Sequence, residues 1–180
     1  MHRIIFVSAI LFGFFVAAAL AADMARLELQ SSAFAPNAMI PMPYVCTDAG
    51  GAGKSPPLTW HGTPASARTF AVVVRDPDAP GGSFVHWVVY NLPAGTTKLE
   101  ADVPKTDTVP GGGDQGVNGL GAIGYLGPCP PPGKPHHYHF QLYALDSELK
   151  LKPEATADDV EQAAKGHTLA EADLVGIFER

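Results

Sequence analysis

The sequence predicts a single, mainly β domain in which two antiparallel sheets pack together and one helix lies at the periphery of the C-terminal region. Gly and Pro, with 19 and 17 of the 180 residues, are frequent enough for a domain rich in turns but too few for a disordered chain. Short segments with strand periodicity recur along the chain, and one segment carries the signals of a helix. At this length one domain is the natural outcome, and we place it at residues 23–180.

The first 22 residues differ in kind from the rest. The basic head Met1-His2-Arg3 precedes an uncharged apolar run whose end is rich in alanine, with Ala19 and Ala21 forming an A-x-A site. This is the pattern of a secretory signal peptide, so we expect cleavage after Ala21 or Ala22 and a periplasmic or secreted mature protein. The alternative is a retained membrane anchor, since the run is about long enough to span a bilayer. The small residues at its end and the lack of a basic stop-transfer flank favour the signal peptide.

The strands are predicted from the spacing of apolar residues. Leu27 and Leu29 alternate with polar residues, which is the pattern of a half-buried strand. The runs 71–74 and 87–90 are apolar at every position, so both are expected in the middle of a sheet covered on two faces. The predicted strands span residues 25–30, 58–60, 69–75, 84–91, 138–146 and 174–178.

Two further segments are predicted from their turn and capping residues. Thr156 is a typical N-cap, Asp159 occupies the N3 position of a capping box, and Gly166 ends the helix that they begin. Residues 103–121 show no apolar periodicity and are expected to form a long loop. Long ordered loops in compact domains are often functional.

Charge limits the classes of partner. The net charge of −6 and the pI near 5.5 argue against an extended nucleic-acid-binding surface, which needs clustered Lys and Arg. Any site for an anion must therefore be small and local. No stable membrane anchor is expected after the signal peptide is removed.

The two cysteines, Cys46 and Cys129, both follow the signal peptide. An oxidising compartment would permit them to pair, while two separately buried thiols are the alternative. A thiol-redox function is not favoured, because the sequence has no C-x-x-C motif.

Polar residues gather where the predicted strands end. Asp76-Pro77-Asp78-Ala79-Pro80 follows the strand of residues 69–75, and its prolines hold two carboxylates in a rigid turn. His86 lies within the next apolar run, where regular alternation places it on the same face as Val88 and Tyr90. A histidine in such a place is more often a core residue than a functional one.

A stiff loop leads into the next long strand. Residues 124–133, Gly-Tyr-Leu-Gly-Pro-Cys-Pro-Pro-Pro-Gly, are soon followed by His136-His137-Tyr138-His139. Strand periodicity puts His136 and Tyr138 on one face and His137 and His139 on the other.

Two enzymatic interpretations are open. In the first, His137 and His139 have the spacing of two metal ligands on one strand face, and Asp76, Asp78 or His86 completes the site. In the second, Ser83, His86 and Asp76 act in nucleophilic hydrolysis, although no G-x-S-x-G elbow is present. Both signals are weak.

A third interpretation is passive recognition of an anion, which needs only donors that lie near one another. The spacing of the residues favours it narrowly over the two enzymatic interpretations. The donors would be His86, His136, the Tyr138 hydroxyl and backbone amides of the loop around Gly127.

Taken together in their order and spacing, these motifs resemble the phosphatidylethanolamine-binding protein family, most closely its bacterial branch, often called Raf kinase inhibitor-like. The resemblance covers nearly all of the chain after the signal peptide. It rests on Asp76-Pro77-Asp78-Ala79-Pro80, His86-Trp87, the Gly-Tyr-x-Gly-Pro-x-Pro-Pro motif of residues 124–131, and His136-x-Tyr138.

The resemblance implies a two-sheet antiparallel β fold with a small cavity for phosphate, acetate-like anions or a phosphorylated head group. Members are regarded mainly as binders and as inhibitors of kinases or proteases, not as enzymes, and no metal or cofactor belongs to their site. A protein partner is therefore part of the expectation. Carried over by motif, the cavity residues are Asp76, Asp78, His86, Gly127, Pro128, His136 and Tyr138.

Two features qualify this expectation. His137 stands where many relatives have Arg, and since histidine is not always charged, any pairing or docking role of that Arg does not transfer directly.

In addition, a carboxylate such as Asp76 disfavours a nearby anion unless a proton compensates it. Asp76 would either orient and charge an imidazole or accept a hydrogen bond from an acidic O–H or ammonium of the ligand. Both arrangements favour a phosphomonoester monoanion or phosphoethanolamine over sulfate.

Overall fold

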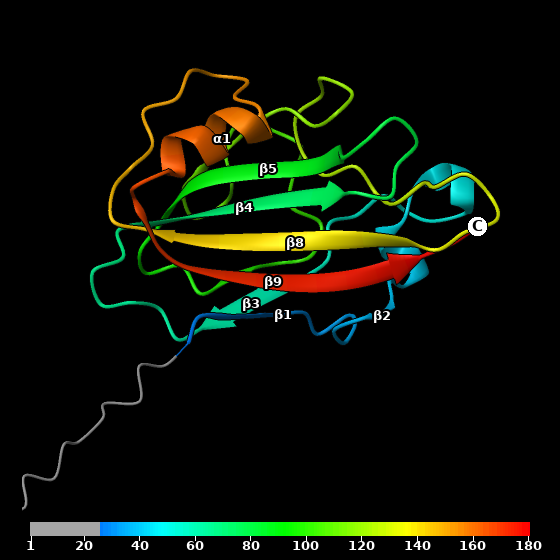
Figure 1. Cartoon of the computed structure of the whole chain (residues 1–180), viewed down its shortest axis with the longest axis horizontal. Helices are drawn as coiled ribbons and strands as arrows, with labels where there is room; N and C mark the ends of the chain where they lie inside the picture. Colours follow the sequence, from blue (N-terminus) through cyan, green and yellow to red (C-terminus); the bar gives the residue numbers. More distant parts are fainter. Residues whose placement is uncertain (1–25) are drawn as a thin grey trace, which may run out of the picture.

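The computed structural model describes residues 26–180 and shows a β domain with one α-helix (Figure 1). The predicted signal peptide, residues 1–22, lies outside the described residues. Within residues 26–180, no helix has the length and apolar character needed to cross a membrane.

In chain order the elements are β1 (Glu28–Gln30), β2 (Ala38–Met39), the 3-10 helices η1 (Met42–Tyr44) and η2 (Thr47–Ala49), β3 (Leu58–His61), β4 (Thr69–Asp76), β5 (Phe84–Pro93), β6 (Lys98–Leu99), β7 (Asp114–Gln115), β8 (His136–Leu145), α1 (Ala157–Ala164) and β9 (Thr168–Phe178).

The strands form two sheets, which confirms the predicted fold class. The larger sheet has six strands in the order β2-β9-β8-β4-β5-β7, and the smaller has three in the order β1-β3-β6. Neighbours run antiparallel, except that β2 pairs with β9 in parallel. Side chains from both sheets share one apolar core, in which Trp60 of β3 meets Phe70 of β4 with ring centroids 5.4 Å apart.

A second apolar layer covers the other face of the larger sheet. Val73 of β4 and Val88 of β5 belong to one cluster with Val160 and Ala164 of α1. The runs 71–74 and 87–90 are consequently buried on both faces, as their unbroken apolar sequence predicted.

The observed strand ends correct several predicted boundaries. β8 begins at His136 rather than at residue 138, so the paired histidines 136 and 137 belong to the strand. β9 begins at Thr168, and the prediction of a short strand at 174–178 was wrong in length. Its first half exposes alternate side chains and lacks an apolar pattern, yet it pairs with β8 throughout.

The predicted loop 103–121 is irregular over most of its length but contains the two-residue strand β7, which pairs with β5. The buried side chain of Gln115 in β7 accepts a hydrogen bond from Trp87 Nε1 at 2.7 Å. The same amide donates to the carbonyls of Pro104 and Thr106 at 2.7 Å each. One side chain therefore holds the loop against the core.

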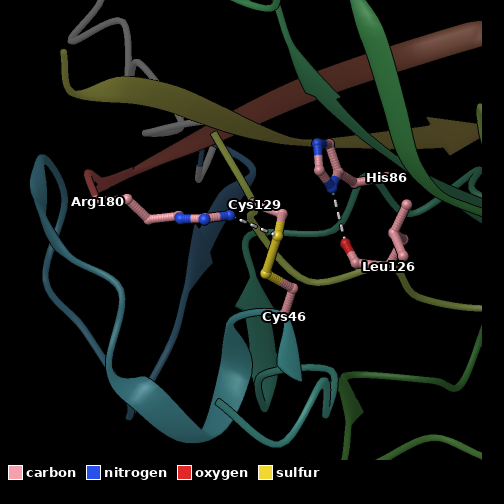
Figure 2. Close-up of a disulfide and its surroundings, with 5 residues drawn as sticks. All are labelled: Cys46, His86, Leu126, Cys129 and Arg180. Carbon is pink, nitrogen blue, oxygen red and sulfur yellow. Dashed lines mark hydrogen bonds between the residues drawn. A yellow bond between two sulfur atoms is a disulfide. The ribbon is translucent and has the colours of Figure 1, made fainter. Parts of the chain in front are cut away.

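Cys46 and Cys129 form a disulfide, so the structure has the paired arrangement of the two that the sequence allowed (Figure 2). The bridge links the segment before η2 to the proline-rich loop that leads into β8. Beside it, Cys46 N donates to the carbonyl of Pro128 at 3.1 Å, and Arg180 Nη1 donates to Cys129 Sγ at 3.5 Å. Two segments far apart in sequence are thus held together.

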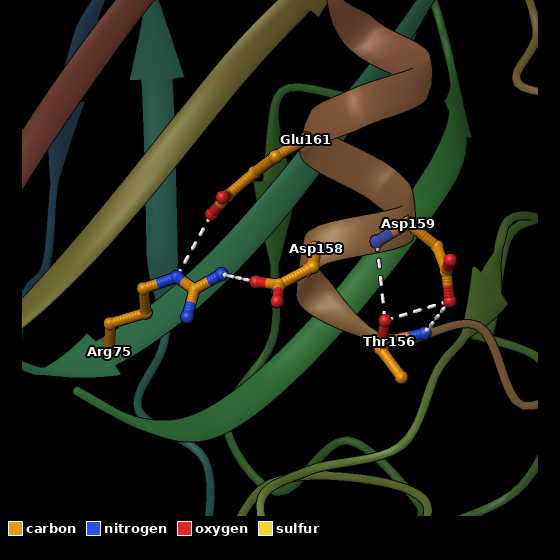
Figure 3. A network of polar contacts seen from close by, with 5 residues as sticks. All are labelled: Arg75, Thr156, Asp158, Asp159 and Glu161. Atoms are coloured by element: carbon orange, nitrogen blue, oxygen red, sulfur yellow. Dashed lines mark hydrogen bonds and ion pairs between the residues drawn. The ribbon is translucent and has the colours of Figure 1, made fainter. Parts of the chain in front are cut away.

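The helix α1 is capped and attached to the sheet as Figure 3 shows. Asp159 N donates to Thr156 Oγ1 at 3.2 Å, and Thr156 N donates to the Asp159 carboxylate at 2.9 Å, which completes the predicted capping box. Arg75 of β4 reaches the helix and donates to Asp158 at 2.7 Å and to Glu161 at 2.9 Å. The helix ends before Gly166, as predicted.

Thr156→Ala should lower the free energy of unfolding by about 1 kcal/mol, because it leaves an amide of the first helical turn without its cap. Urea denaturation followed by circular dichroism measures the change. Thr63→Ala, at an exposed position, is the control and should change stability by less than about 0.5 kcal/mol. Equal losses for the two variants would contradict the role assigned to the cap.

Candidate functional site

The predicted site residues meet at one end of the larger sheet, where β4 ends and β8 begins, at the right of Figure 1. β4 pairs with β5 on one side and with β8 on the other. Arg75, next to last in β4, lies opposite Val85 and His139. The following residue, Asp76, is therefore flanked by the beginnings of β5 and β8. Its partner His136, the first residue of β8, lies 60 residues further along the chain.

A β-bulge places His86 in this site. Val74 pairs with Trp87 and Arg75 pairs with Val85, so His86 is an extra residue with no partner on β4. An extra residue reverses the alternation of side chains beyond it. The expectation that His86 shares a face with Val88 and Tyr90 was therefore wrong, since those two residues pack under the helix. His86 instead packs edge-on against Tyr138 of the inter-sheet core, with ring centroids 5.1 Å apart.

The backbone at Leu126 fixes the orientation of the His86 ring (Figure 2). Leu126 N donates to the carbonyl of His86 at 2.8 Å, and His86 Nδ1 lies 2.7 Å from the carbonyl of Leu126. A carbonyl can only accept, so Nδ1 carries the proton. Burial lowers the pKa of His86 below its ordinary value, which favours the neutral ring. The neutral tautomer then leaves Nε2 with a free lone pair.

A buried acid–imidazole pair lies beside this ring. His136 Nδ1 is 2.7 Å from one carboxylate oxygen of Asp76, and both side chains are less than a tenth exposed. The other oxygen of Asp76 accepts a hydrogen bond from Asp78 N at 2.9 Å. Asp76 therefore orients an imidazole, which is the first of the two roles that the sequence allowed. Because Nδ1 faces the carboxylate, Nε2 is the ring nitrogen of His136 that a ligand can reach.

These side chains form the inner wall of a cavity of about 410 Å³. Of the predicted cavity residues, four line it, namely Asp76, His86, Gly127 and His136. Its apolar lining includes Phe84, Pro130 and Leu120, whose side chain is exposed. The remaining lining residues are Cys46, Thr47, Asp48, Ala79, Pro80, Leu126, Cys129 and Pro131.

Packing of two loops forms one side of the cavity. A Cβ on Gly127 would lie 2.6 Å from the backbone carbon of Val45 and 2.7 Å from Cys46 N, so only glycine allows this approach. Tyr125 Oη donates to the carbonyl of Tyr44 at 3.0 Å. This contact between the two loops places Thr47 and Asp48 in the wall of the cavity. The sequence prediction missed them, although the possible pairing of Cys46 with Cys129 was a signal that residues 46–48 lie near the loop.

Three of the predicted cavity residues do not line it. Asp78 lies outside, where its carboxylate accepts from His137 N at 2.8 Å and lies 2.7 Å from His137 Nδ1. Pro128 is buried and positions the loop through its carbonyl. Tyr138 lies beneath the histidines, and its buried hydroxyl has no hydrogen-bond partner in the described part of the chain. Burial, with Asp76 close by, raises the pKa of this phenol.

The structure does not assemble either predicted enzymatic constellation. Ser83 lines a separate hollow with Arg75 and Asp158, away from the imidazoles. His137 and His139 are each bound to a different carboxylate, Asp78 and Asp173, on the opposite face of β8 from the cavity. Among residues 26–180, no group of three or more His, Cys, Asp or Glu side chains could hold a metal ion.

The cavity has little positive charge of its own. No Lys or Arg from residues 26–180 lines it, while the carboxylates of Asp48 and Asp76 both do. Any positive charge on its wall must therefore come from an imidazole, and a ligand with a large negative charge is disfavoured.

The chain was compared with known families and structures. The profile of the family described as phosphatidylethanolamine-binding protein matches residues 30–179. A UPF0098 protein of Methanothermobacter thermautotrophicus is 45% identical over 154 residues, covering 86% of this chain and 99% of the relative. A protein of Mycobacterium tuberculosis with lipoprotein in its name, LppC, is 44% identical over 85% of this chain and 72% of its own. The crystal structure of Escherichia coli YbcL, described as a member of the mammalian PEBP family, is 33% identical with a TM-score of 0.79, covering 87% of this chain and 99% of YbcL.

The two His–Asp pairs on β8 allow a matched test of burial. His136→Ala should lower the free energy of unfolding by about 3 kcal/mol, since it leaves the carboxylate of Asp76 buried without its partner. His137→Ala, which removes an exposed pair with the same 2.7 Å separation, should cost less than about 1 kcal/mol. Chemical denaturation measures both values, and a cost for His137→Ala as large as that for His136→Ala would refute the assignment.

Stability should depend on pH through His86. Its pKa is lower in the folded protein than in the unfolded chain, so the unfolded chain takes up the proton first as pH falls. The free energy of unfolding should therefore decrease as pH drops below about 6.5 toward the folded-state pKa. His86→Gln should make this decrease shallower, whereas His61→Gln, at an exposed position, should not. Chemical denaturation between pH 5 and 8 measures these values. If His86 contributed nothing, the free energy of unfolding would vary with pH identically in the wild type and in His86→Gln.

Proposed function

Because the chain belongs to the phosphatidylethanolamine-binding protein family, we propose that it is a binding protein that holds a small anion or a phosphorylated head group in the cavity of Asp76, His86 and His136. The name of the family does not identify the ligand of this chain. The proposal rests on the chemistry of the cavity.

The main support is the way in which two imidazoles are held. His86 and His136 both use Nδ1 for a contact within the protein, at 2.7 Å to Leu126 O and to Asp76. Within the described residues no hydrogen bond engages Nε2 of either ring, and both rings line the cavity. Two oriented ring nitrogens with no partner in the described residues, in a concave site that also has apolar lining residues, are suited to a small polar group.

The enzymatic alternative would use the cluster of Asp76, His86 and His136 for hydrolysis or for metal-dependent chemistry. Our proposal is that the protein is not an enzyme and needs no cofactor. Asp76 and His136 resemble the acid and base of a catalytic triad, but in the described residues neither imidazole makes a hydrogen bond to a Ser, Thr or Cys side chain. We further propose that the protein inhibits or modulates a partner protein. Leu120, which lines the cavity and is 70% exposed, offers such a partner an apolar contact.

We place the protein outside the cytoplasm, periplasmic or secreted. The predicted signal peptide supports this location, as does the disulfide, which persists in oxidising compartments. The name of the mycobacterial relative also refers to a lipoprotein.

Calorimetric titration with phosphoethanolamine and with inorganic phosphate tests the binding function. Wild-type protein should bind at least one of them, and His136→Gln should bind at least tenfold more weakly, because a charge-assisted hydrogen bond is lost. His137→Gln, on the opposite face of β8, should bind within about twofold of wild type. Phosphorus NMR of phosphoethanolamine after incubation should show the ligand unchanged. Steady conversion to phosphate would support the hydrolase instead, and no binding of either compound would refute the proposal.

A further inference from the structure

His86 and His136 present different chemistry to a ligand although both are histidines. His136 faces the carboxylate of Asp76 through Nδ1 at 2.7 Å, so Nε2 is the ring nitrogen that faces the cavity. His86 faces a neutral carbonyl through Nδ1. It is 4% exposed and packs between Phe84 and Tyr138, with ring centroids 5.0 and 5.1 Å away. These surroundings favour a neutral ring whose Nε2 accepts a hydrogen bond.

The charged groups around His86 do not reverse this assignment. Asp76 favours a proton on the ring and His136 disfavours it, while burial acts in the same direction as His136 and is the largest influence on the pKa. Asp48 also lines the cavity but has an exposed side chain. The inner wall therefore offers an acceptor at Nε2 of His86, beside the imidazole of His136 that Asp76 orients.

We propose that the cavity selects a tetrahedral monoanion that carries one acidic proton, such as a phosphate monoester monoanion, which donates to Nε2 of His86 and lies against Nε2 of His136. This selectivity rests on the proposed binding function and assigns His86 as its determinant. A sulfate or sulfate ester has only acceptors, so it would set an unprotonated oxygen against the lone pair of His86. A dianion would also meet two carboxylates with no Lys or Arg from the described residues on the wall.

Methyl phosphate and methyl sulfate are the probes that separate the effect of the proton from those of shape and charge. At pH 6 a large share of methyl phosphate is the monoanion, because the second pKa of a phosphate ester is about 6. Methyl sulfate has nearly the same shape and the same single charge but no proton. Wild-type protein should bind methyl phosphate about tenfold or more tightly than methyl sulfate at pH 6, as expected for a hydrogen bond to a charged ligand.

The preference should follow the proton of the ligand. At pH 8 only about one hundredth of methyl phosphate is still the monoanion, so its affinity relative to that of methyl sulfate should fall by more than about tenfold. Methyl sulfate does not titrate in this range, so its own profile reports only changes in the protein.

Variants of His86 test the assignment of the acceptor. His86→Phe should bring the ratio of the two affinities at pH 6 close to one while methyl sulfate still binds. His86→Gln supplies an amide oxygen and should restore part of the preference for methyl phosphate. If His86→Phe does not fold, the ratio for the wild type and for His86→Gln still decides the matter.

The outcomes separate the two levels of the proposal. Binding of methyl sulfate as tight as that of methyl phosphate at pH 6 overturns the selectivity and leaves the binding function in place. A preference unchanged in His86→Phe overturns the role of His86. Failure of both probes and of phosphoethanolamine to bind would overturn the binding function itself.

Discussion

The pairing of β4 on both of its edges determines where the candidate site lies. β4 is a buried strand that brings together β5, which follows it directly, and β8, which comes some 60 residues later through Asp76 and His136. Antiparallel pairing on both edges puts the end of β4 next to the beginnings of both neighbours. A polar residue at that point meets side chains from three strands. The site is therefore a result of the sheet topology, and the loops complete it.

A buried carboxylate would ordinarily be costly at such a position. Asp76 is 3% exposed, yet one of its oxygens accepts from His136 and the other from the amide of Asp78 in its own turn. The turn that ends the strand thus supplies part of the hydrogen bonding that its first residue needs. The carboxylate of Asp76 is engaged within the protein, which leaves the imidazoles of His86 and His136 with a ring nitrogen toward the cavity.

Local sequence patterns predicted most of the scaffold, and motif resemblance predicted four of the fifteen residues that line the cavity. The capping box at Thr156 and the doubly buried runs have signals within a few residues, so they could be recognised. The bulge at His86 could not, because an extra residue is visible only against the partner strand. Asp78 was misplaced for a related reason: its motif gives proximity to the site, but the direction of its side chain depends on His137 across the sheet. Leu126 acts through its backbone, which side-chain patterns do not report.

The bulge also affects how related chains should be aligned and sorted. A chain one residue shorter between Phe84 and Val88 would pair with β4 without interruption, and the side chain at the position of His86 would turn toward the helix-covered face. Such a chain would keep its scaffold and could keep its histidine, yet the imidazole would face Val73 and Val160 in place of the cavity. Under the proposed function, the length of this segment would therefore separate chains that place an imidazole in the cavity from chains that share only the scaffold.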